Sequence, residues 1–85
     1  MHLFAFLNRL KVQVSDDQRY IDVDYTPGSP DALYDICDVN GRIIKTGKIN
    51  RDSMRVAVSD LLNSAYVFLV LDGDRIRTQR FTIHR

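Results

Sequence analysis

The chain contains no glutamate, although 11 of its 85 residues are acidic. Every acidic residue is therefore aspartate, which favours turns and helix caps, whereas glutamate favours helix interiors. Alanine, the best helix former, occurs only four times. No stretch of helical length carries apolar residues at helical spacing. These absences disfavour a helical or alternating α/β protein and predict short strands joined by turns.

Cysteine is nearly absent as well. Cys37 is the only one, so an internal disulfide is impossible and a cysteine-based metal site is disfavoured. The two histidines, His2 and His84, stand at opposite ends of the sequence, so nothing suggests a base beside Cys37. Because Cys37 follows Ile36 in an apolar stretch, we interpret it as a small buried apolar residue.

Catalytic and cofactor motifs are also missing. The four glycines are scattered along the chain and form no phosphate-binding loop. No serine stands near a plausible base, so we predict a protein that is not an enzyme and that needs no cofactor. The densest carboxylate group has two interpretations, a solvated acidic face or a weak Ca²⁺ site, although its spacing matches no EF-hand loop. This group consists of Asp16, Asp17, Asp22 and Asp24.

No long apolar run occurs near the N-terminus. Leu3–Leu7 is too short to span a membrane, and it lacks the basic flank and cleavage site of a signal peptide. We therefore expect either a cytoplasmic start or a longer natural sequence upstream. Residues 1–9 are predicted to be an apolar lead-in, and residues 10–85 a single domain. The spacing within Leu3–Leu10 fits a short helix and an extended strand equally well.

The net charge of +1 predicts no strong attraction to nucleic acid or to anionic lipid. Acidic residues nevertheless predominate in residues 1–40 and basic residues in residues 41–85. One interpretation is that the two halves attract each other across solvated faces of the fold. The other is a basic patch that binds a partner. That patch would comprise Arg75, Arg77, Arg80 and Arg85.

Short runs of alternating or continuous apolar residues recur every 8–12 residues or so, separated by turn signals. This spacing predicts an all-β fold, a small antiparallel Ig-like or fibronectin-like β-sandwich of about seven strands. Ala65–Leu71 is continuously apolar, which predicts a strand buried on both sides, and a single helical turn is possible within Ser59–Ser64. The other strands are expected at Leu10–Val14, Tyr20–Tyr25, Leu33–Val39, Arg42–Ile49, Met54–Val58 and Arg75–His84.

Two dipeptides predict hairpin turns. Asn40-Gly41 suits a two-residue turn in which both residues have positive φ, and such a turn fixes the register of the flanking strands. Asp72-Gly73 predicts a second hairpin, leading into the last strand. In that strand Phe81 and Ile83 are expected to share one face.

Three segments resemble, in order and spacing, the C-terminal sorting domains of the Bacteroidota type IX secretion system. Ile36-Cys-Asp-Val-Asn-Gly-Arg-Ile-Ile-Lys-Thr-Gly47 is similar to the first family element, Val58-Ser-Asp-Leu-Leu-Asn-Ser-Ala-Tyr66 to the second, and Asp72-Gly73 with Thr78-Gln-Arg-Phe81 to the third. Ser64 stands where the family has glycine. The positions that carry the resemblance, called the family-motif residues below, are Ile36, Asp38, Asn40, Gly41, Gly47, Asp60, Leu61, Tyr66, Gly73, Thr78, Gln79 and Phe81.

The resemblance implies an Ig-like recognition module that is secreted, periplasmic or displayed at the cell surface, and that is read by outer-membrane secretion machinery. It implies that most family-motif residues maintain packing and turns. The exposed contacts with the machinery would be Lys45, Asp60, Arg80 and Arg85. The alternative is a stand-alone Ig-like module that binds protein or glycan at the cell envelope by adding a strand at a sheet edge. Edge strands also make a homodimer possible.

Overall fold

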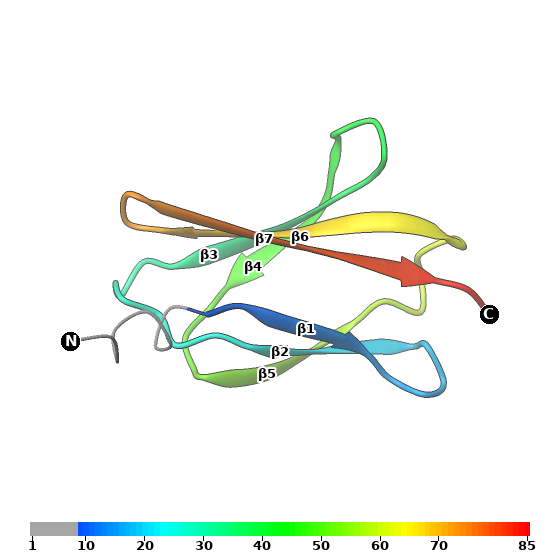
Figure 1. Ribbon diagram of the computed structural model, residues 1–85, viewed down its shortest axis with the longest axis horizontal. Helices are drawn as coiled ribbons and strands as arrows, with labels where there is room; N and C mark the ends of the chain where they lie inside the picture. The colour runs from blue at the N-terminus through cyan, green and yellow to red at the C-terminus, as the bar shows by residue number, and fades with distance from the viewer. Residues whose placement is uncertain (1–8) are drawn as a thin grey trace.

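The computed structural model describes residues 9–85, which form seven strands in two antiparallel sheets (Figure 1). This confirms the predicted all-β sandwich of about seven strands. In chain order the strands are β1 (Lys11–Val14), β2 (Tyr20–Asp24), β3 (Leu33–Cys37), β4 (Ile43–Lys48), β5 (Ser53–Ala57), β6 (Ser64–Asp72) and β7 (Arg75–Ile83).

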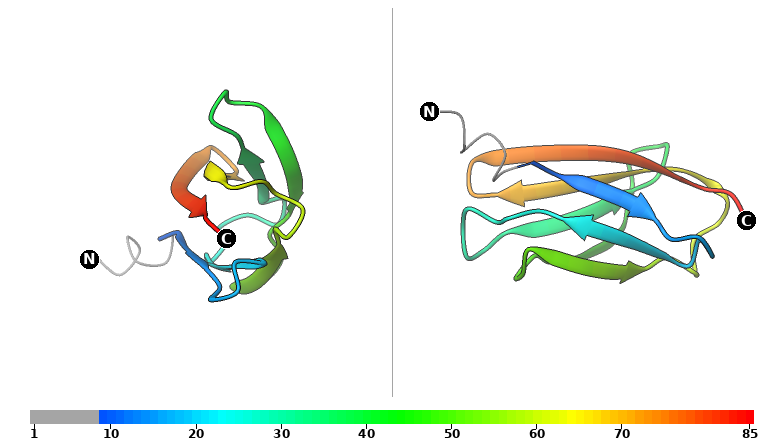
Figure 2. Two further views of the ribbon diagram at one scale, coloured as in Figure 1. Left: turned by 90° about the vertical axis from the view of Figure 1, so that its right-hand side faces the viewer. Right: turned by 60° about the horizontal axis from the view of Figure 1, so that its bottom comes forward.

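One sheet has three strands in the order β1-β2-β5, and the other has four in the order β4-β3-β6-β7. The end-on view in Figure 2 shows the two layers facing each other. Because β4 pairs with β3 rather than with β5, the fourth strand belongs to the second sheet, whereas in a constant-type Ig domain it belongs to the first. The arrangement is the fibronectin-like variant of the Ig-like sandwich.

The core lies between the two layers and follows the period-2 alternation of the strands. On β2, Ile21 and Val23 are buried while Asp22 between them is only half-buried. Tyr34 stacks on Phe68 across β3 and β6 with ring centroids 5.0 Å apart. The remaining buried apolar residues are Tyr25, Ala32, Ile36, Ile49, Val56, Val58, Leu61, Tyr66, Val70, Phe81 and Ile83.

β6 is not buried on both sides, so the expectation for Ala65–Leu71 is wrong. Tyr66, Phe68 and Val70 point into the core, but the residues between them lie on the outer face and are half-buried or exposed. A continuous apolar run shows that both faces of a strand are apolar, and it cannot show whether this chain alone covers both.

Two other expectations have different outcomes. Ser59–Ser64 contains no helix: a single hydrogen bond, from the amide of Leu61 to the carbonyl of Val58 (3.0 Å), closes a turn there. The choice between helix and strand for Leu3–Leu10, and the predicted lead-in of residues 1–9, fall almost entirely outside the described residues. Leu10 itself packs against the core.

The sandwich has two ends that carry different loops (Figure 1). We call one the Arg85 end, which gathers the β1–β2 turn, the β3–β4 hairpin, the β5–β6 turn and Arg85. We call the other the Asp72 end, which gathers the β2–β3 loop, the β4–β5 turn and the β6–β7 turn.

Candidate recognition site

The β3–β4 hairpin has a three-residue loop, Val39–Gly41, rather than a two-residue one. The amide of Gly41 donates to the carbonyl of Asp38 (3.0 Å), and the amide of Asp38 donates to the carbonyl of Arg42 (2.9 Å). Gly41 has a φ of +80°, whereas Asn40 has no positive φ. Val39 and Asn40 are therefore the centre of a type I turn, which a left-handed glycine follows. The predicted two-residue turn at Asn40-Gly41 is wrong.

Asp38 explains why the longer turn forms. Its Oδ1 accepts hydrogen bonds from the amides of Asn40 (2.9 Å) and Arg42 (3.0 Å), and its Oδ2 accepts one from Arg42 Nε (3.2 Å). The bond from the Arg42 amide contributes most to lowering the pKa of Asp38. An aspartate that binds backbone amides two and four residues ahead stabilises a turn that a two-residue hairpin would not permit. The strands pair accordingly, with Cys37 opposite Ile43.

Gly47 is explained by close packing. It lies opposite Tyr34 in the β3–β4 ladder, and a Cβ atom added to Gly47 would stand 2.5 Å from Tyr34 Cε2. That distance is far shorter than a carbon–carbon contact. The absence of a side chain at position 47 therefore lets the Tyr34 ring lie flat on β4 while its other side stacks on Phe68.

Lys45 and Asp60, two of the four predicted machinery contacts, bind each other. Lys45 Nζ donates to Asp60 Oδ2 at 2.8 Å. This hydrogen bond is the main cause of the lowered pKa of Asp60. Lys45 belongs to β4 of the four-stranded sheet, and Asp60 follows β5 of the three-stranded sheet. The ion pair therefore connects the two sheets at the Arg85 end.

Tyr66 and Phe81 form an aromatic pair across β6 and β7, with ring centroids 5.5 Å apart, and both are buried. The Tyr66 hydroxyl donates to the carbonyl of Leu62 (2.5 Å) and so holds the β5–β6 turn. At that turn neither Asn63 nor Ser64 has a positive φ. Serine is accommodated where the resembling family has glycine because no left-handed residue is needed.

Arg85 is bound to the sandwich rather than free. Its guanidinium donates to the carbonyls of Val58 (2.8 Å), Leu61 (2.9 Å) and Gln18 (3.1 Å). Its amide donates to Asn63 Oδ1 at 3.1 Å. These bonds connect the last residue of the sequence to the β1–β2 and β5–β6 turns, so the third predicted machinery contact has a structural role in the described chain.

Arg80 differs from the other three predicted contacts. It is exposed on β7, and its side chain has no hydrogen-bond or ion-pair partner within residues 9–85. Thr78 and Gln79, the neighbouring family-motif residues, are exposed on the same strand. Arg75 and Arg77 also lie on β7. The predicted basic patch is not formed as one surface: Arg75 and Arg77 lie on one face of β7, Arg80 lies on the other, and Arg85 is bound to the turns.

The predicted hairpin at Asp72-Gly73 forms with a two-residue turn. Asp72 pairs with Arg75, so Gly73 and Asp74 are the central residues. Gly73 has a φ of +63° and Asp74 has no positive φ. Glycine at the first central position is what a type II′ turn requires.

Asp16, Asp17, Asp22 and Asp24 do not form a common site. Asp17 accepts hydrogen bonds from Ser15 Oγ (2.7 Å) and the Arg19 amide. Asp22 forms an ion pair with Arg55 (2.8 Å), and Asp24 binds Ser53 Oγ (2.7 Å). No cluster of three potential metal-ligating side chains occurs within the described residues. The Asp22–Arg55 pair joins the acidic and basic halves of the sequence, as the first charge interpretation expects.

Sequence reasoning missed a buried carboxylate at the Asp72 end. Asp72 is only 3% exposed, and its Oδ2 accepts hydrogen bonds from the Tyr25 hydroxyl (2.5 Å) and the Gly28 amide (2.7 Å). Burial would raise the pKa of Asp72, but these hydrogen bonds outweigh it and lower the pKa. Burial and the bond to Asp72 raise the pKa of Tyr25 to about 12. The signal was the alternation in β6, which makes Asp72 face inward after Phe68 and Val70.

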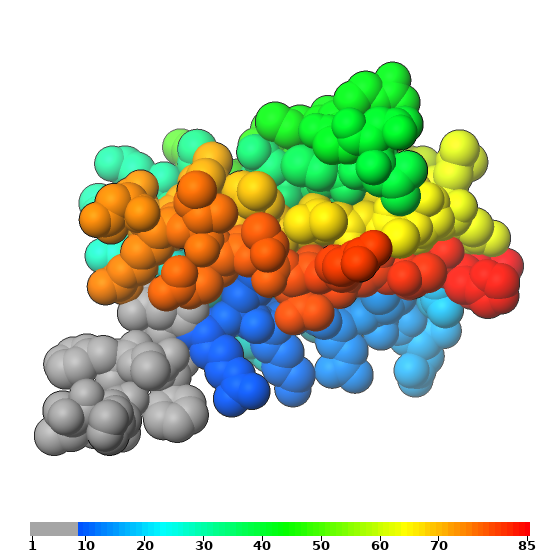
Figure 3. Space-filling view, turned by 45° about the horizontal axis from the view of Figure 1, so that its top comes forward, coloured from blue at the N-terminus to red at the C-terminus, as the bar shows by residue number. Residues whose placement is uncertain are grey.

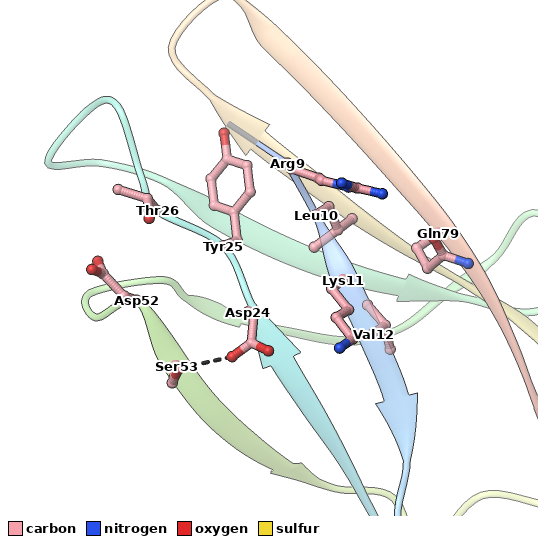
Figure 4. Close-up of a pocket in the computed structure, with 10 residues that line it drawn as sticks. All are labelled: Arg9, Leu10, Lys11, Val12, Asp24, Tyr25, Thr26, Asp52, Ser53 and Gln79. Carbon is pink, nitrogen blue, oxygen red and sulfur yellow. Dashed lines mark hydrogen bonds between the residues drawn. The ribbon is translucent and has the colours of Figure 1, made fainter. Parts of the chain in front are cut away.

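A cavity of about 780 Å³ lies beside the start of β1 (Figure 4). Its charged residues are of both signs, and the one hydrogen bond drawn there joins Ser53 to Asp24. Gln79 is the only family-motif residue that lines it, so this cavity is separate from the predicted contacts. Its lining consists of Arg9, Leu10, Lys11, Val12, Asp24, Tyr25, Thr26, Asp52, Ser53 and Gln79.

Within residues 9–85, no helix is both long and apolar enough to cross a membrane. Comparison of the sequence with protein-family models gives no match, and a search of curated proteins gives none either.

Proposed function

We propose that this chain is a non-enzymatic recognition module of the type IX C-terminal sorting kind, which outer-membrane secretion machinery reads. The observation that supports the proposal most strongly is that the three resembling segments, which follow one another along the chain, are joined by specific contacts. The Lys45–Asp60 ion pair joins the first segment to the second. The Tyr66–Phe81 stack joins the second to the third.

Several family-motif residues share one structural role, which is to fix turns and the packing of aromatic rings. Asp38 and Gly41 shape the hairpin, Gly47 admits the Tyr34 ring, and Tyr66 fixes the β5–β6 turn. A set of turn and packing residues that must agree in register is what a small sandwich needs in order to present one defined surface. The motif therefore specifies the shape of the Arg85 end and of β7.

Of the four predicted contacts with the machinery, Arg80 is the best candidate for direct recognition. Lys45 and Asp60 neutralise each other, and the Arg85 guanidinium is used by three backbone carbonyls. Arg80 presents a free guanidinium from an exposed strand, and such a group binds carboxylates with two parallel hydrogen bonds. We propose that the machinery offers an acidic side chain to Arg80, and that the module works in the cell envelope or at the cell surface.

An export assay tests this proposal. Residues 1–85 are fused behind a signal peptide and a reporter in a host that carries the type IX system, and the reporter is assayed at the cell surface and in the periplasm. We expect the wild-type fusion to reach the surface. A reporter that remains in the periplasm would contradict the proposal and favour the stand-alone envelope module.

Two variants separate recognition from folding. Arg80→Ala should reduce surface delivery about tenfold or more while leaving the far-UV CD spectrum and the urea midpoint unchanged, because the side chain has no partner within the described chain. Arg77→Ala on the same strand is the matched control and should be exported normally. Equal export of the two variants would contradict a specific role of Arg80, but it would not contradict the sorting proposal.

A further inference from the structure

The outer face of the four-stranded sheet is unusually apolar. On β6, Val67 and Leu69 are half-buried and Leu71 is 37% exposed, and on either side Leu33 is 39% and Ile76 60% exposed. Leu33 pairs with Leu71, and Leu71 pairs with Ile76. These three residues therefore form a continuous apolar row across β3, β6 and β7. Contiguous exposed apolar surface of this kind is typical of protein interfaces.

This face is also hollowed. A cavity of about 630 Å³ lies over β6, with the tip of the β3–β4 hairpin on one side and β7 on the other. Figure 3 shows the hairpin standing above the band formed by β6, with β7 along its opposite flank. Val39, at the hairpin tip, is 69% exposed. The hollow is lined by Cys37, Asp38, Val39, Gly41, Ala65, Tyr66, Val67, Leu69, Thr78 and Arg80.

Three charged residues lie on this face: Lys48 on β4, which pairs with Leu33, and two opposite charges that flank β6. Asp35 on β3 pairs in the ladder with Leu69, and Arg80 on β7 pairs with Val67. Neither side chain has a hydrogen-bond or ion-pair partner among residues 9–85. Within one chain they do not meet, because β6 lies between their strands and both side chains stand roughly perpendicular to the sheet, pointing away from its face rather than towards each other.

We propose that the occupant of this face is a second copy of the same chain, packed face to face about a two-fold axis parallel to β6. Such an axis places β3 of one copy over β7 of the other. Asp35 then lies within reach of Arg80 of the partner subunit, and the symmetry forms this ion pair twice. The same rotation carries each hairpin over the open side of the other copy's hollow, where Val39 can be covered.

The charge arrangement favours a second copy over an unrelated partner, because a self-complementary face needs one acid and one base on opposite sides of the axis. The available area limits the affinity. A sheet of four strands, each at most nine residues long, offers a footprint of roughly 500 Å², which is at the low end for specific interfaces. We therefore expect a reversible dimer with a Kd on the order of 10–100 µM.

Sedimentation equilibrium on the full chain, from about 1 µM to about 1 mM, tests the proposal. We expect a monomer–dimer equilibrium. Asp35→Arg and Arg80→Asp should each weaken it about tenfold or more, because each places like charges opposite each other. An equimolar mixture of the two variants, and the double variant, should dimerise again. The mixture also excludes misfolding as the cause of any loss, since both partners are single variants.

Arg77→Asp is the matched control, because it makes the same charge change on the other face of β7 and should leave the Kd within about twofold. A chain that is monomeric at all concentrations would overturn the proposal. So would single variants that dimerise like the wild type, or a mixture that stays monomeric.

Cys37 gives an independent readout, because it lies on the same face opposite Val67 and is a free, half-buried thiol. Its alkylation by a maleimide should slow several-fold as the protein concentration rises through the Kd. In the Asp35→Arg variant the rate should not depend on concentration. A rate independent of concentration in the wild type would contradict the proposed geometry. The inference does not rest on the proposed function, since it is tested on the isolated chain; the dimer would occupy Arg80, so recognition by the machinery would require the monomer.

Discussion

The two ends of the sandwich are stabilised by different kinds of polar interaction. The Arg85 end is joined by exposed or half-buried polar groups: the Lys45–Asp60 pair, the Asp38 turn and the three carbonyl contacts of Arg85. The Asp72 end depends on one buried carboxylate and its two donors, Tyr25 and Gly28. Exposed polar contacts are individually weak, whereas a buried polar group is costly once its partner is removed. The first end should therefore tolerate single changes, and the second should not.

Asp72→Ala should have the largest effect on this comparison. The substitution leaves the Tyr25 hydroxyl and the Gly28 amide without their acceptor in a buried site, so the free energy of unfolding should fall by about 3 kcal/mol. Urea denaturation measures the loss. Asp74→Ala, at the next turn position, is the control and should change stability by less than about 0.5 kcal/mol. Similar values for the two variants would show that the Asp72 network is not a stabilising unit.

The change in the free energy of unfolding at alkaline pH should also depend on the Asp72 end. The folded-state pKa of Tyr25, about 12, is above its ordinary value of 10.0. Because the pKa is raised on folding, the neutral Tyr25 hydroxyl contributes fully to the free energy of unfolding below pH 10. That contribution is lost as the pH rises from 10 to 12. The loss should be about 2–3 kcal/mol over that window. Urea midpoints measured at pH 9, 11 and 12 for the wild type and for Tyr25→Phe test this, and parallel declines in both proteins would contradict it.

At acid pH the dependence runs in the opposite direction, and stability is lost as the pH falls. Because the folded-state pKa of Asp72 is lowered, its contribution is present above the ordinary value of 3.8 and is lost as the pH falls through the folded pKa. Asp38 and Asp60 at the other end also have lowered pKa values, although Asp38 is only half-buried and Asp60 is exposed. Acid titration alone therefore distinguishes the two ends less clearly than alkaline titration.

The fold could be predicted from the sequence because strand alternation and turn residues are local signals. Ile21, Val23 and the turn at Gly73 lie where the pattern places them. The hairpin at Asn40 was misjudged because two turn types compete for the same dipeptide, and the choice depends on the hydrogen bonds of the Asp38 side chain. A residue pattern names the turn residues but does not decide between such alternatives.

The candidate site was less predictable, because a side chain's partner depends on tertiary contacts. Lys45 and Asp60 were both expected to be exposed contacts, and nothing local indicates that strands from different sheets bring them together. Arg85 likewise finds carbonyls from two distant turns. Asp72 could have been found by counting the alternation of β6, whereas its donors Tyr25 and Gly28 could not.

Arg85→Ala should have an intermediate effect. It removes three hydrogen bonds from a charged donor to backbone carbonyls at a partly exposed site, which predicts a loss of about 1–2 kcal/mol. Arg85→Lys should recover only part of this, because one ammonium cannot reproduce the fork of the guanidinium. Urea denaturation of both variants gives the values. If Arg85→Ala lowers the free energy of unfolding as much as Asp72→Ala does, the proposed difference between the two ends is wrong.

The Lys45–Asp60 pair should have the smallest effect. Asp60 is largely exposed, at 65%, and Lys45 is 26% exposed, so solvent weakens their attraction. A double-mutant cycle with Lys45→Ala and Asp60→Ala should give a coupling of roughly 0.5 kcal/mol that falls towards zero in 1 M salt, where the screening length is about 3 Å. A coupling above about 2 kcal/mol that persists in high salt would mean that the ion pair behaves as a buried one. The Arg85 end would then contain a single dominant contact of its own, as the Asp72 end does.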